Sequence, residues 1–131
     1  MKKQTRTALV VEDDAHNLLA ISTLLKELEI DFKRNTTGSE VLKQAHIMYP
    51  DLDFILLDMD LPEGDPFLIY EALRSDPRLE NIPVIAIVDN HLVVSLQSRI
   101  EQKHFAGVAA KPLTPQALQN LINTVLNGLD S

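Results

Sequence analysis

Short apolar runs alternate along the chain with longer segments in which apolar residues recur every three or four positions. The short runs are typical of strands in a parallel sheet buried on both faces, and the longer pattern is typical of amphipathic helices. The runs predict strands at residues 7–12, 31–35, 53–57, 84–88 and 107–110. The longer segments predict helices at about residues 15–28, 38–48, 65–74, 91–103 and 114–128.

This strict alternation of strands and helices predicts a single α/β domain. Because crossovers between parallel strands are right-handed, it indicates a doubly wound five-stranded parallel sheet with helices on both faces. The segment at 31–35 mixes charged residues with one phenylalanine, so we expect this strand near an edge of the sheet.

Polar residues at the predicted helix starts are candidate caps. The sequence Thr37-Gly38-Ser39-Glu40 predicts a capping box, in which the Thr37 hydroxyl and the Glu40 carboxylate satisfy free backbone N–H groups. The other candidate caps are Asp14, Asp65, Asp89 or Asn90, and Thr114.

Charged residues follow three of the predicted strands. The run at 54–57 leads into Asp58, the run at 8–11 leads into Glu12 and Asp13, and the run at 108–110 leads into Lys111. Ligands of such sheets bind outside the carboxyl ends of the strands, so we expect these side chains to converge at one edge. Carboxylates beside an ammonium group indicate a site for a divalent metal and a phosphoryl group. The alternatives are a solvated acidic turn and a surface lysine.

Composition narrows the classes of protein. The 131 residues suit one domain, with a core from about residue 6 to residue 128, and 45% of them are hydrophobic. The net charge of -7 argues against a nucleic-acid partner, because phosphate contacts need Lys and Arg. The absence of cysteine excludes disulfides and thiolate metal sites. No apolar run reaches the length of a membrane span, so we expect a cytoplasmic protein without a membrane partner.

Four motifs together resemble the response-regulator receiver domain of two-component signalling, within the CheY-like superfamily. They are residues 10–14 (VVEDD), 57–62 (LDMDLP), 82–86 (IPVIA) and 111–112 (KP), and the resemblance covers essentially the whole sequence. It implies a flavodoxin-like sheet of strand order 2-1-3-4-5 with five helices. We expect residues 1–131 to form a single receiver domain with no output domain.

The resemblance also implies a role for each charged residue. Asp58 would accept a phosphoryl group from a phosphohistidine on a histidine kinase or a histidine phosphotransfer protein. Glu12, Asp13, Asp58 and the backbone carbonyl of Asp60 would hold Mg²⁺, and Lys111 would contact the phosphoryl oxygens. The protein would then not be an enzyme, apart from phosphorylating itself and losing the phosphate slowly. Receivers of this kind commonly dimerise, so a homodimer is a further expectation.

The sequence departs from the family pattern at the usual conformational switch. Val88 stands where the family has Ser or Thr, and valine cannot donate a hydrogen bond. Val108 stands where the family has an aromatic residue, and Asp65-Pro66 replaces the usual Asp-Gly. We therefore expect the phosphoryl chemistry to be retained and the readout to be weak or to use other contacts.

Two other functions remain open at this point. The run from Phe54 to Asp60 also resembles the first motif of haloacid-dehalogenase-like phosphatases, although Pro62 departs from that motif and Glu12 and Asp13 stay unexplained. The second alternative is a pseudo-receiver, a phosphorylation-independent protein-binding module that could use the predicted helix 91–103 and Phe105. For Phe105 the competing interpretation is core packing.

Overall fold

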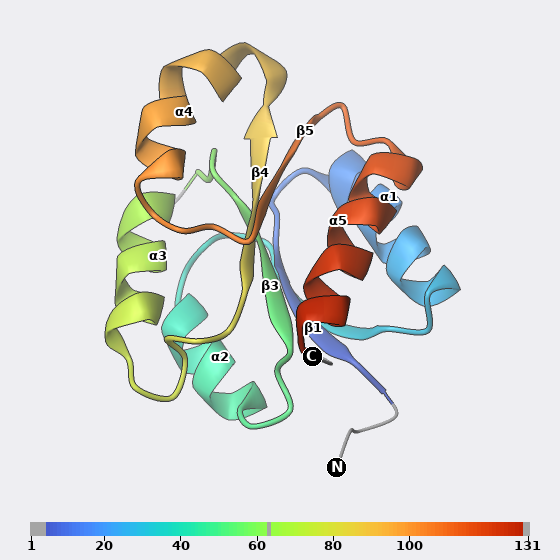
Figure 1. Cartoon of the computed structure of the whole chain (residues 1–131), viewed down its shortest axis with the longest axis vertical. Helices are drawn as coiled ribbons and strands as arrows, with labels where there is room; N and C mark the ends of the chain where they lie inside the picture. Colours follow the sequence, from blue (N-terminus) through green and yellow to red (C-terminus); the bar gives the residue numbers. More distant parts are fainter. Residues whose placement is uncertain (1–4, 63, 130–131) are drawn as a thin grey trace.

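The computed structural model describes residues 5–62 and 64–129, in which strands and helices alternate along the chain (Figure 1). The strands are β1 (Thr7–Val11), β2 (Asp31–Asn35), β3 (Phe54–Asp58), β4 (Val84–Asp89) and β5 (Gly107–Lys111). The α-helices are α1 (Ala15–Glu27), α2 (Val41–Met48), α3 (Pro66–Ser75), α4 (Val93–Glu101) and α5 (Pro115–Leu129). A 3₁₀ turn, η1 (Asn90–Leu92), precedes α4.

The strands form one parallel sheet in the order β2-β1-β3-β4-β5, which confirms the predicted flavodoxin-like architecture. Val10 of β1 pairs with Leu56 of β3, which pairs with Ile85 of β4. The chain moves outward from β1 to β2 and then crosses back to β3, so the topological switch point lies between β1 and β3. In such sheets the crevice at the carboxyl ends beside the switch point is where ligands bind.

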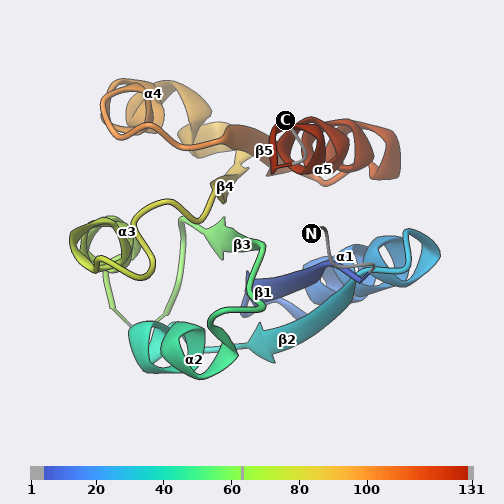
Figure 2. The same ribbon diagram turned by 60° about the horizontal axis from the view of Figure 1, so that its bottom comes forward.

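Helices cover the two faces of the sheet, with α2, α3 and α4 on one face and α1 and α5 on the other (Figure 2). Successive side chains of a strand point to opposite faces, so Leu9 and Val11 pack under the first group and Ala8 and Val10 under the second. Every residue of β3 is buried, as expected for a central strand. Within the described ranges, no helix is both long and apolar enough to cross a membrane.

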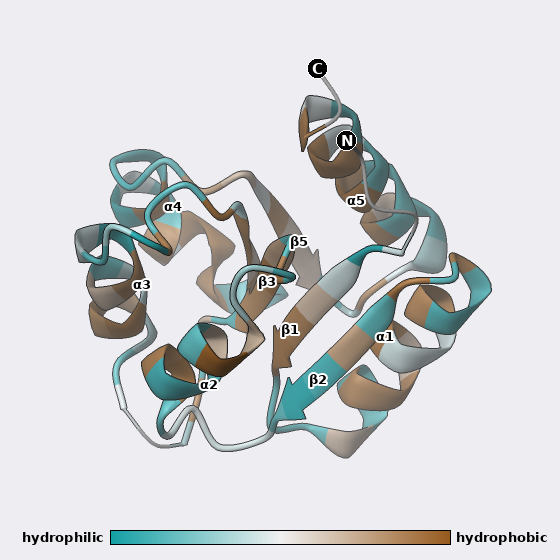
Figure 3. Cartoon of the chain, turned by 90° about the horizontal axis from the view of Figure 1, so that it is seen from below, coloured by the Kyte–Doolittle hydropathy of each residue, from teal (hydrophilic) through white to brown (hydrophobic). Residues whose placement is uncertain are grey.

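The polar strand β2 lies at one edge of the sheet, as its mixed sequence predicts. In Figure 3, β2 is largely coloured as hydrophilic, whereas its neighbour β1 is hydrophobic over most of its length. Phe32 is half-buried, and the charged side chains around it are exposed. The position of this strand explains its composition, because an edge strand meets water on its open side.

The predicted capping box at Thr37 and Glu40 is wrong. Helix α2 begins at Val41, three residues later than predicted, and Glu40 adopts the left-handed conformation with φ 57° and makes no cap hydrogen bond. The Thr37 hydroxyl instead accepts a hydrogen bond from the Ser39 N–H at 3.0 Å. The Asn35 side chain accepts one from the Gly38 N–H at 2.8 Å. These local bonds close a turn after β2, and the turn takes up the groups that would have capped the helix.

The other predicted caps divide into correct and incorrect ones. Asp14, Asp65 and Thr114 each accept a hydrogen bond from a backbone N–H in the first turn of the helix that follows. The predicted cap for the fourth helix, at Asp89 or Asn90, is wrong because neither η1 nor α4 has a side-chain cap hydrogen bond. Asp89 belongs to β4, where it pairs with Lys111. The last helix extends one residue beyond Gly128.

Candidate functional site

Three strand ends bring charged side chains together at the carboxyl edge of the sheet. Asp58 is the last residue of β3, Lys111 is the last residue of β5, and Glu12 directly follows β1. The parallel register places these ends side by side, since Val11 pairs with Leu57 and Asp58 pairs with Ile87. The site therefore results from strand order and register, and the loops add Asp13 and Asp60.

Two carboxylates share one ammonium group in this site. The Lys111 ammonium donates a hydrogen bond to Asp58 Oδ2 at 3.1 Å and lies 3.6 Å from Glu12 Oε1. Backbone groups hold the remaining oxygens, because Asp60 N–H donates to Asp58 Oδ1 at 2.9 Å and Asp14 N–H donates to Glu12 Oε2 at 3.2 Å. Glu12 and Asp58 are completely buried, so their charges are poorly screened by water.

The residues present fit a divalent metal ion. Carboxylate oxygens of Glu12, Asp13 and Asp58 lie within 4.8 Å of one another. Glu12 Oε1 is buried and accepts no hydrogen bond from the described residues, which is costly unless another group satisfies it. Asp13 is exposed, so an ion could enter from solvent. An all-oxygen set with an open side matches Mg²⁺, which keeps part of its water shell.

Burial and neighbouring charges raise the pKa of both the acid and the base of the site. Burial, followed by hydrogen bonding and repulsion from Glu12, raises the pKa of Asp58 to about 8. Burial alone would lower the pKa of Lys111, but the adjacent Asp58 and Glu12 carboxylates outweigh it and raise that pKa. The lysine therefore stays cationic at neutral pH, whereas Asp58 holds a proton until a cation or a rise in pH removes it.

Two further acids lie at the mouth of the site. A hydrogen bond with Asp89, followed by partial burial and by the charge of Asp89, raises the pKa of the exposed Asp60 carboxyl. The Asp60 backbone contacts the site directly through its N–H bond to Asp58. The sequence predicts Asp60 as a carbonyl ligand and Asp89 as a candidate helix cap. The structure also places both carboxylates beside the cluster, since β4 continues to Asp89, which pairs with Lys111.

The two atypical switch positions lie in contrasting surroundings. Val88 is completely buried in β4 and pairs with Ala110, so no hydroxyl occupies this point beside the site. Val108, which pairs with Ala86, is 41% exposed. Position 108 thus presents an aliphatic side chain at the surface.

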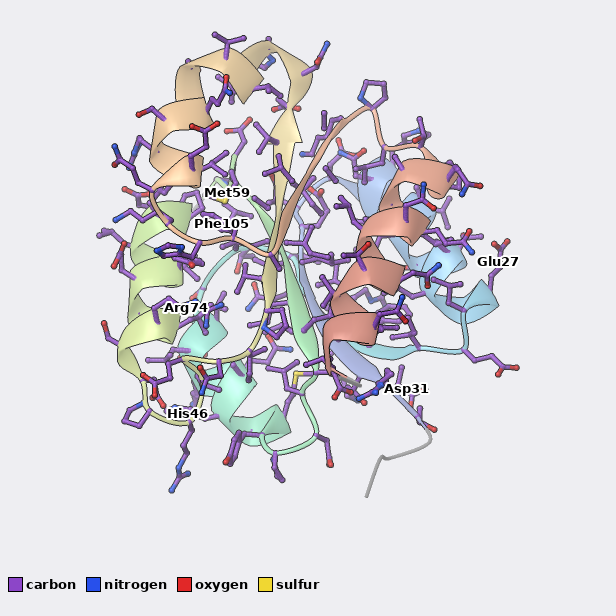
Figure 4. The ribbon with its side chains drawn as sticks, viewed as in Figure 1. Glu27, Asp31, His46, Met59, Arg74 and Phe105 are labelled. Carbon is purple, nitrogen blue, oxygen red and sulfur yellow. The ribbon has the colours of Figure 1, made fainter. Side chains whose placement is uncertain are left out.

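Phe105, for which the sequence left both surface and core positions open, is partly buried and packs against the core cluster beneath α3 and α4 (Figure 4). Its ring stacks on Tyr70 with a centroid distance of 4.1 Å and meets Phe67 edge to face at 6.5 Å. The Tyr70 hydroxyl donates a hydrogen bond to the Lys103 carbonyl, which connects α3 to the turn after α4. The Phe105 ring, two residues before β5, is therefore held by aromatic packing.

Comparison with known proteins agrees with this geometry. The family model of the response regulator receiver domain matches residues 8–123. The polar-differentiation response regulator DivK of Brucella ovis is 30% identical over 110 residues, which is 84% of this chain and 87% of DivK. The signal transduction histidine-protein kinase BarA of Escherichia coli is 26% identical over 92% of this chain, which corresponds to 13% of the length of BarA.

Solved structures share the fold at lower identity. A putative response regulator from Chloroflexus aurantiacus superposes with a TM-score of 0.84 at 22% identity, covering 95% of this chain and 99% of that one. The receiver domain of the sensor histidine kinase PA1611 from Pseudomonas aeruginosa superposes with a TM-score of 0.79 at 24% identity, covering 92% and 98%. That structure contains a magnesium ion coordinated in its active-site cleft.

The relatives are signalling proteins, and they include both a response regulator and a histidine kinase. The family match spans nearly the whole sheet and both strand ends that carry the acids. The chain belongs to the response regulator receiver domain family and is a receiver domain of two-component signalling.

Proposed function

We propose that this receiver domain accepts a phosphoryl group on Asp58 from a phosphohistidine of a histidine kinase or a histidine phosphotransfer protein. The observation that carries the proposal is the position of Asp58, buried at the end of β3 with its carboxylate 3.1 Å from the Lys111 ammonium. In the reaction, a carboxylate oxygen of Asp58 bonds to phosphorus, the N–P bond breaks, and the imidazole leaves.

The surrounding residues have distinct parts in this proposal. Glu12, Asp13, Asp58 and the Asp60 carbonyl would hold Mg²⁺, and the ion supplies positive charge that offsets repulsion between the carboxylates and the phosphoryl group. Lys111 binds a phosphoryl oxygen as a point charge. The ammonium already faces the nucleophile, so it needs no large movement to meet the incoming group.

Incubation with Mg²⁺ and acetyl phosphate, followed by intact mass measurement, tests this proposal. We expect a gain of one phosphoryl group in the wild type, none in Asp58→Asn, and a strongly reduced gain when a chelator removes the metal. Asp31→Asn is the matched control and should behave as the wild type, because Asp31 lies at the amino end of the sheet (Figure 4). An equal mass gain in Asp58→Asn would assign the phosphate to another residue.

A pseudo-receiver is the second candidate function. Val88 and Val108 favour it, because a buried valine and an exposed valine replace the hydroxyl and the aromatic residue of the usual switch. The intact acid cluster opposes it. No mass gain in the wild type with Mg²⁺ would move the conclusion to this candidate. Turnover of a generic phosphomonoester would instead support the phosphatase alternative, and we expect almost none.

For the readout, we expect phosphorylation to perturb the site more than the outer surface of α4. A two-state switch needs contacts that differ between its states, and Val88 cannot supply a hydrogen bond to the phosphoryl group. Backbone NMR shifts with and without a phosphate mimic should therefore change at the carboxyl ends of β1, β3 and β5. Large shifts that reach the exposed side of α4, at Val94, would contradict this expectation.

A further inference from the structure

The edge strand β2 presents unpaired backbone groups on its open side. Among the described residues, β1 is its single neighbour in the sheet. Asp31 N–H donates to the Arg6 carbonyl and Asn35 carbonyl accepts from Glu12 N–H, so alternate residues from Asp31 onward face β1. Phe32 and Arg34 consequently turn their N–H and C=O groups away from the sheet. The Gln44 side chain donates to the Arg34 carbonyl at 3.3 Å, which leaves the groups of Phe32 open.

A hollow of about 500 Å³ lies beside this edge, between α1 and β2. Leu18, Leu19 and Phe32 give it an apolar lining, and the Leu19 side chain is 66% exposed. Lys26 and Arg34 also line it, whereas no carboxylate of the described residues does. This hollow therefore suits a group that combines an apolar side chain with negative charge.

The α2 side of the same edge also combines cations with an exposed apolar side chain. Lys33 points toward the α2 side, since its partner Leu9 packs there, and Lys43 of α2 is exposed nearby. Ile47 of α2 is 75% exposed. It lines, with Lys43, a hollow of about 230 Å³, which Glu40 also lines. Each side of β2 thus offers two cations and one exposed aliphatic side chain, and the hollows on the α2 side are also lined by the Glu40 and Asp51 carboxylates.

The charges of the edge contrast with those of the whole chain, which carries a net charge of -7. No ion pair with a carboxylate joins Lys26, Lys33, Arg34 or Lys43 within residues 5–62 and 64–129. The carboxylates of Glu29, Asp31 and Asp51 line a hollow at the amino end of the strand, which Lys26, Lys33 and Ile47 also line. The middle and the carboxyl end of the edge are therefore complementary to a negatively charged segment.

Charged residues on an edge strand protect a protein against unwanted strand pairing. Here the same charges determine whether a second copy of this chain or an acidic segment can pair with β2. In a pair of β2 strands from two copies, Lys33 and Arg34 of both chains would lie close together, and like charges opposite each other are destabilising. The same cations stabilise an acidic strand. The charge pattern consequently favours an acidic partner segment over a second copy of this chain.

We propose that the β2 edge binds an extended acidic segment of a partner protein, which adds as a strand and alternates acidic with apolar side chains. The open backbone groups of Phe32 supply main-chain hydrogen bonds, as in other cases of strand addition. Carboxylates of the segment pair with Lys26 and Arg34 on one side and with Lys33 and Lys43 on the other. Its apolar side chains pack on Leu19 and Ile47. This binding does not require Asp58.

Binding of a fluorescent peptide of alternating glutamate and valine residues to the full 131-residue protein tests the proposal. Anisotropy should show saturable binding that is also seen with Asp58→Asn. Amide NMR shifts should concentrate in β2 and in the facing turns of α1 and α2. A peptide with lysine for glutamate should not bind, and N-methylation of alternate peptide residues should abolish binding because it removes the main-chain donors.

Two double variants that lose the same number of positive charges distinguish binding at the β2 edge from general electrostatic attraction. The double variant Lys26→Gln with Arg34→Gln should weaken binding about fivefold, since exposed ion pairs contribute modestly. The control Arg78→Gln with Arg99→Gln removes the same charge from exposed sites away from β2 and should leave binding unchanged. Equal loss in both variants, shifts concentrated away from β2 and the facing turns of α1 and α2, or no binding by the acidic peptide at millimolar concentration would each overturn the proposal. Concentration-dependent self-association through β2 would do the same.

Discussion

Replacing Lys111 by Met should lower the free energy of unfolding by about 3 kcal/mol at pH 9, in a buffer without metal. The side chain is 11% exposed and is the cation that both Glu12 and Asp58 contact. Its loss leaves two buried carboxylates without a counter-charge. Near pH 6 the cost should be about half as large, because Asp58, whose pKa is about 8, is then protonated.

Urea unfolding of the wild type and the variant at both pH values measures this effect. Lys103→Met is a matched control, since the same substitution there removes a partly exposed ion pair with Glu71. Such pairs contribute about 0.2 to 1 kcal/mol, with little dependence on pH in this range. If Lys111→Met cost no more than Lys103→Met at pH 9, the carboxylates would have another source of compensation.

Asp58→Asn should stabilise the domain by about 2 kcal/mol at pH 8 and by much less at pH 4.5. Because burial and Glu12 raise the pKa of Asp58 to about 8, the folded state binds a proton that the unfolded state loses near pH 4. Between these values the folded state binds more protons, so the stability of the wild type falls as pH rises. Asparagine does not titrate and can still accept the Asp60 N–H bond.

The difference in unfolding free energy between the two proteins, followed from pH 4 to pH 9 without metal, isolates this group from the other titrating residues. Saturating Mg²⁺ should reduce the difference, because an ion held by Glu12, Asp13 and Asp58 compensates the same charge in the wild type. A difference that stays constant with pH would show that folding does not shift the pKa of Asp58. The expected gain also indicates that this acid costs stability, as functional groups often do.

The elements were predictable because their signals are local. An apolar run predicted the fully buried strand β3. Polar residues before an amphipathic segment predicted the helix caps at Asp14 and Asp65. The capping box failed because Asn35, from the preceding strand, organises the turn around Gly38. The predicted cap of the fourth helix was wrong because Asp89 continues β4 and pairs with Lys111, a residue distant in the chain. Both errors arose where a non-helical partner competed for the same groups.

By itself, the sequence determined the order of the elements, the class of the fold and the receiver family. It also indicated which residue types meet at the carboxyl edge, because the ends of parallel strands always share one edge. Only the tertiary structure decided that Glu12 and Asp58 are fully buried and share a single ammonium. Only the tertiary structure shows that cations from α1, β2 and α2 lie along one edge of the sheet. The physical reason is that distances between side chains on separate elements depend on how those elements pack, and no local pattern of residues encodes that packing.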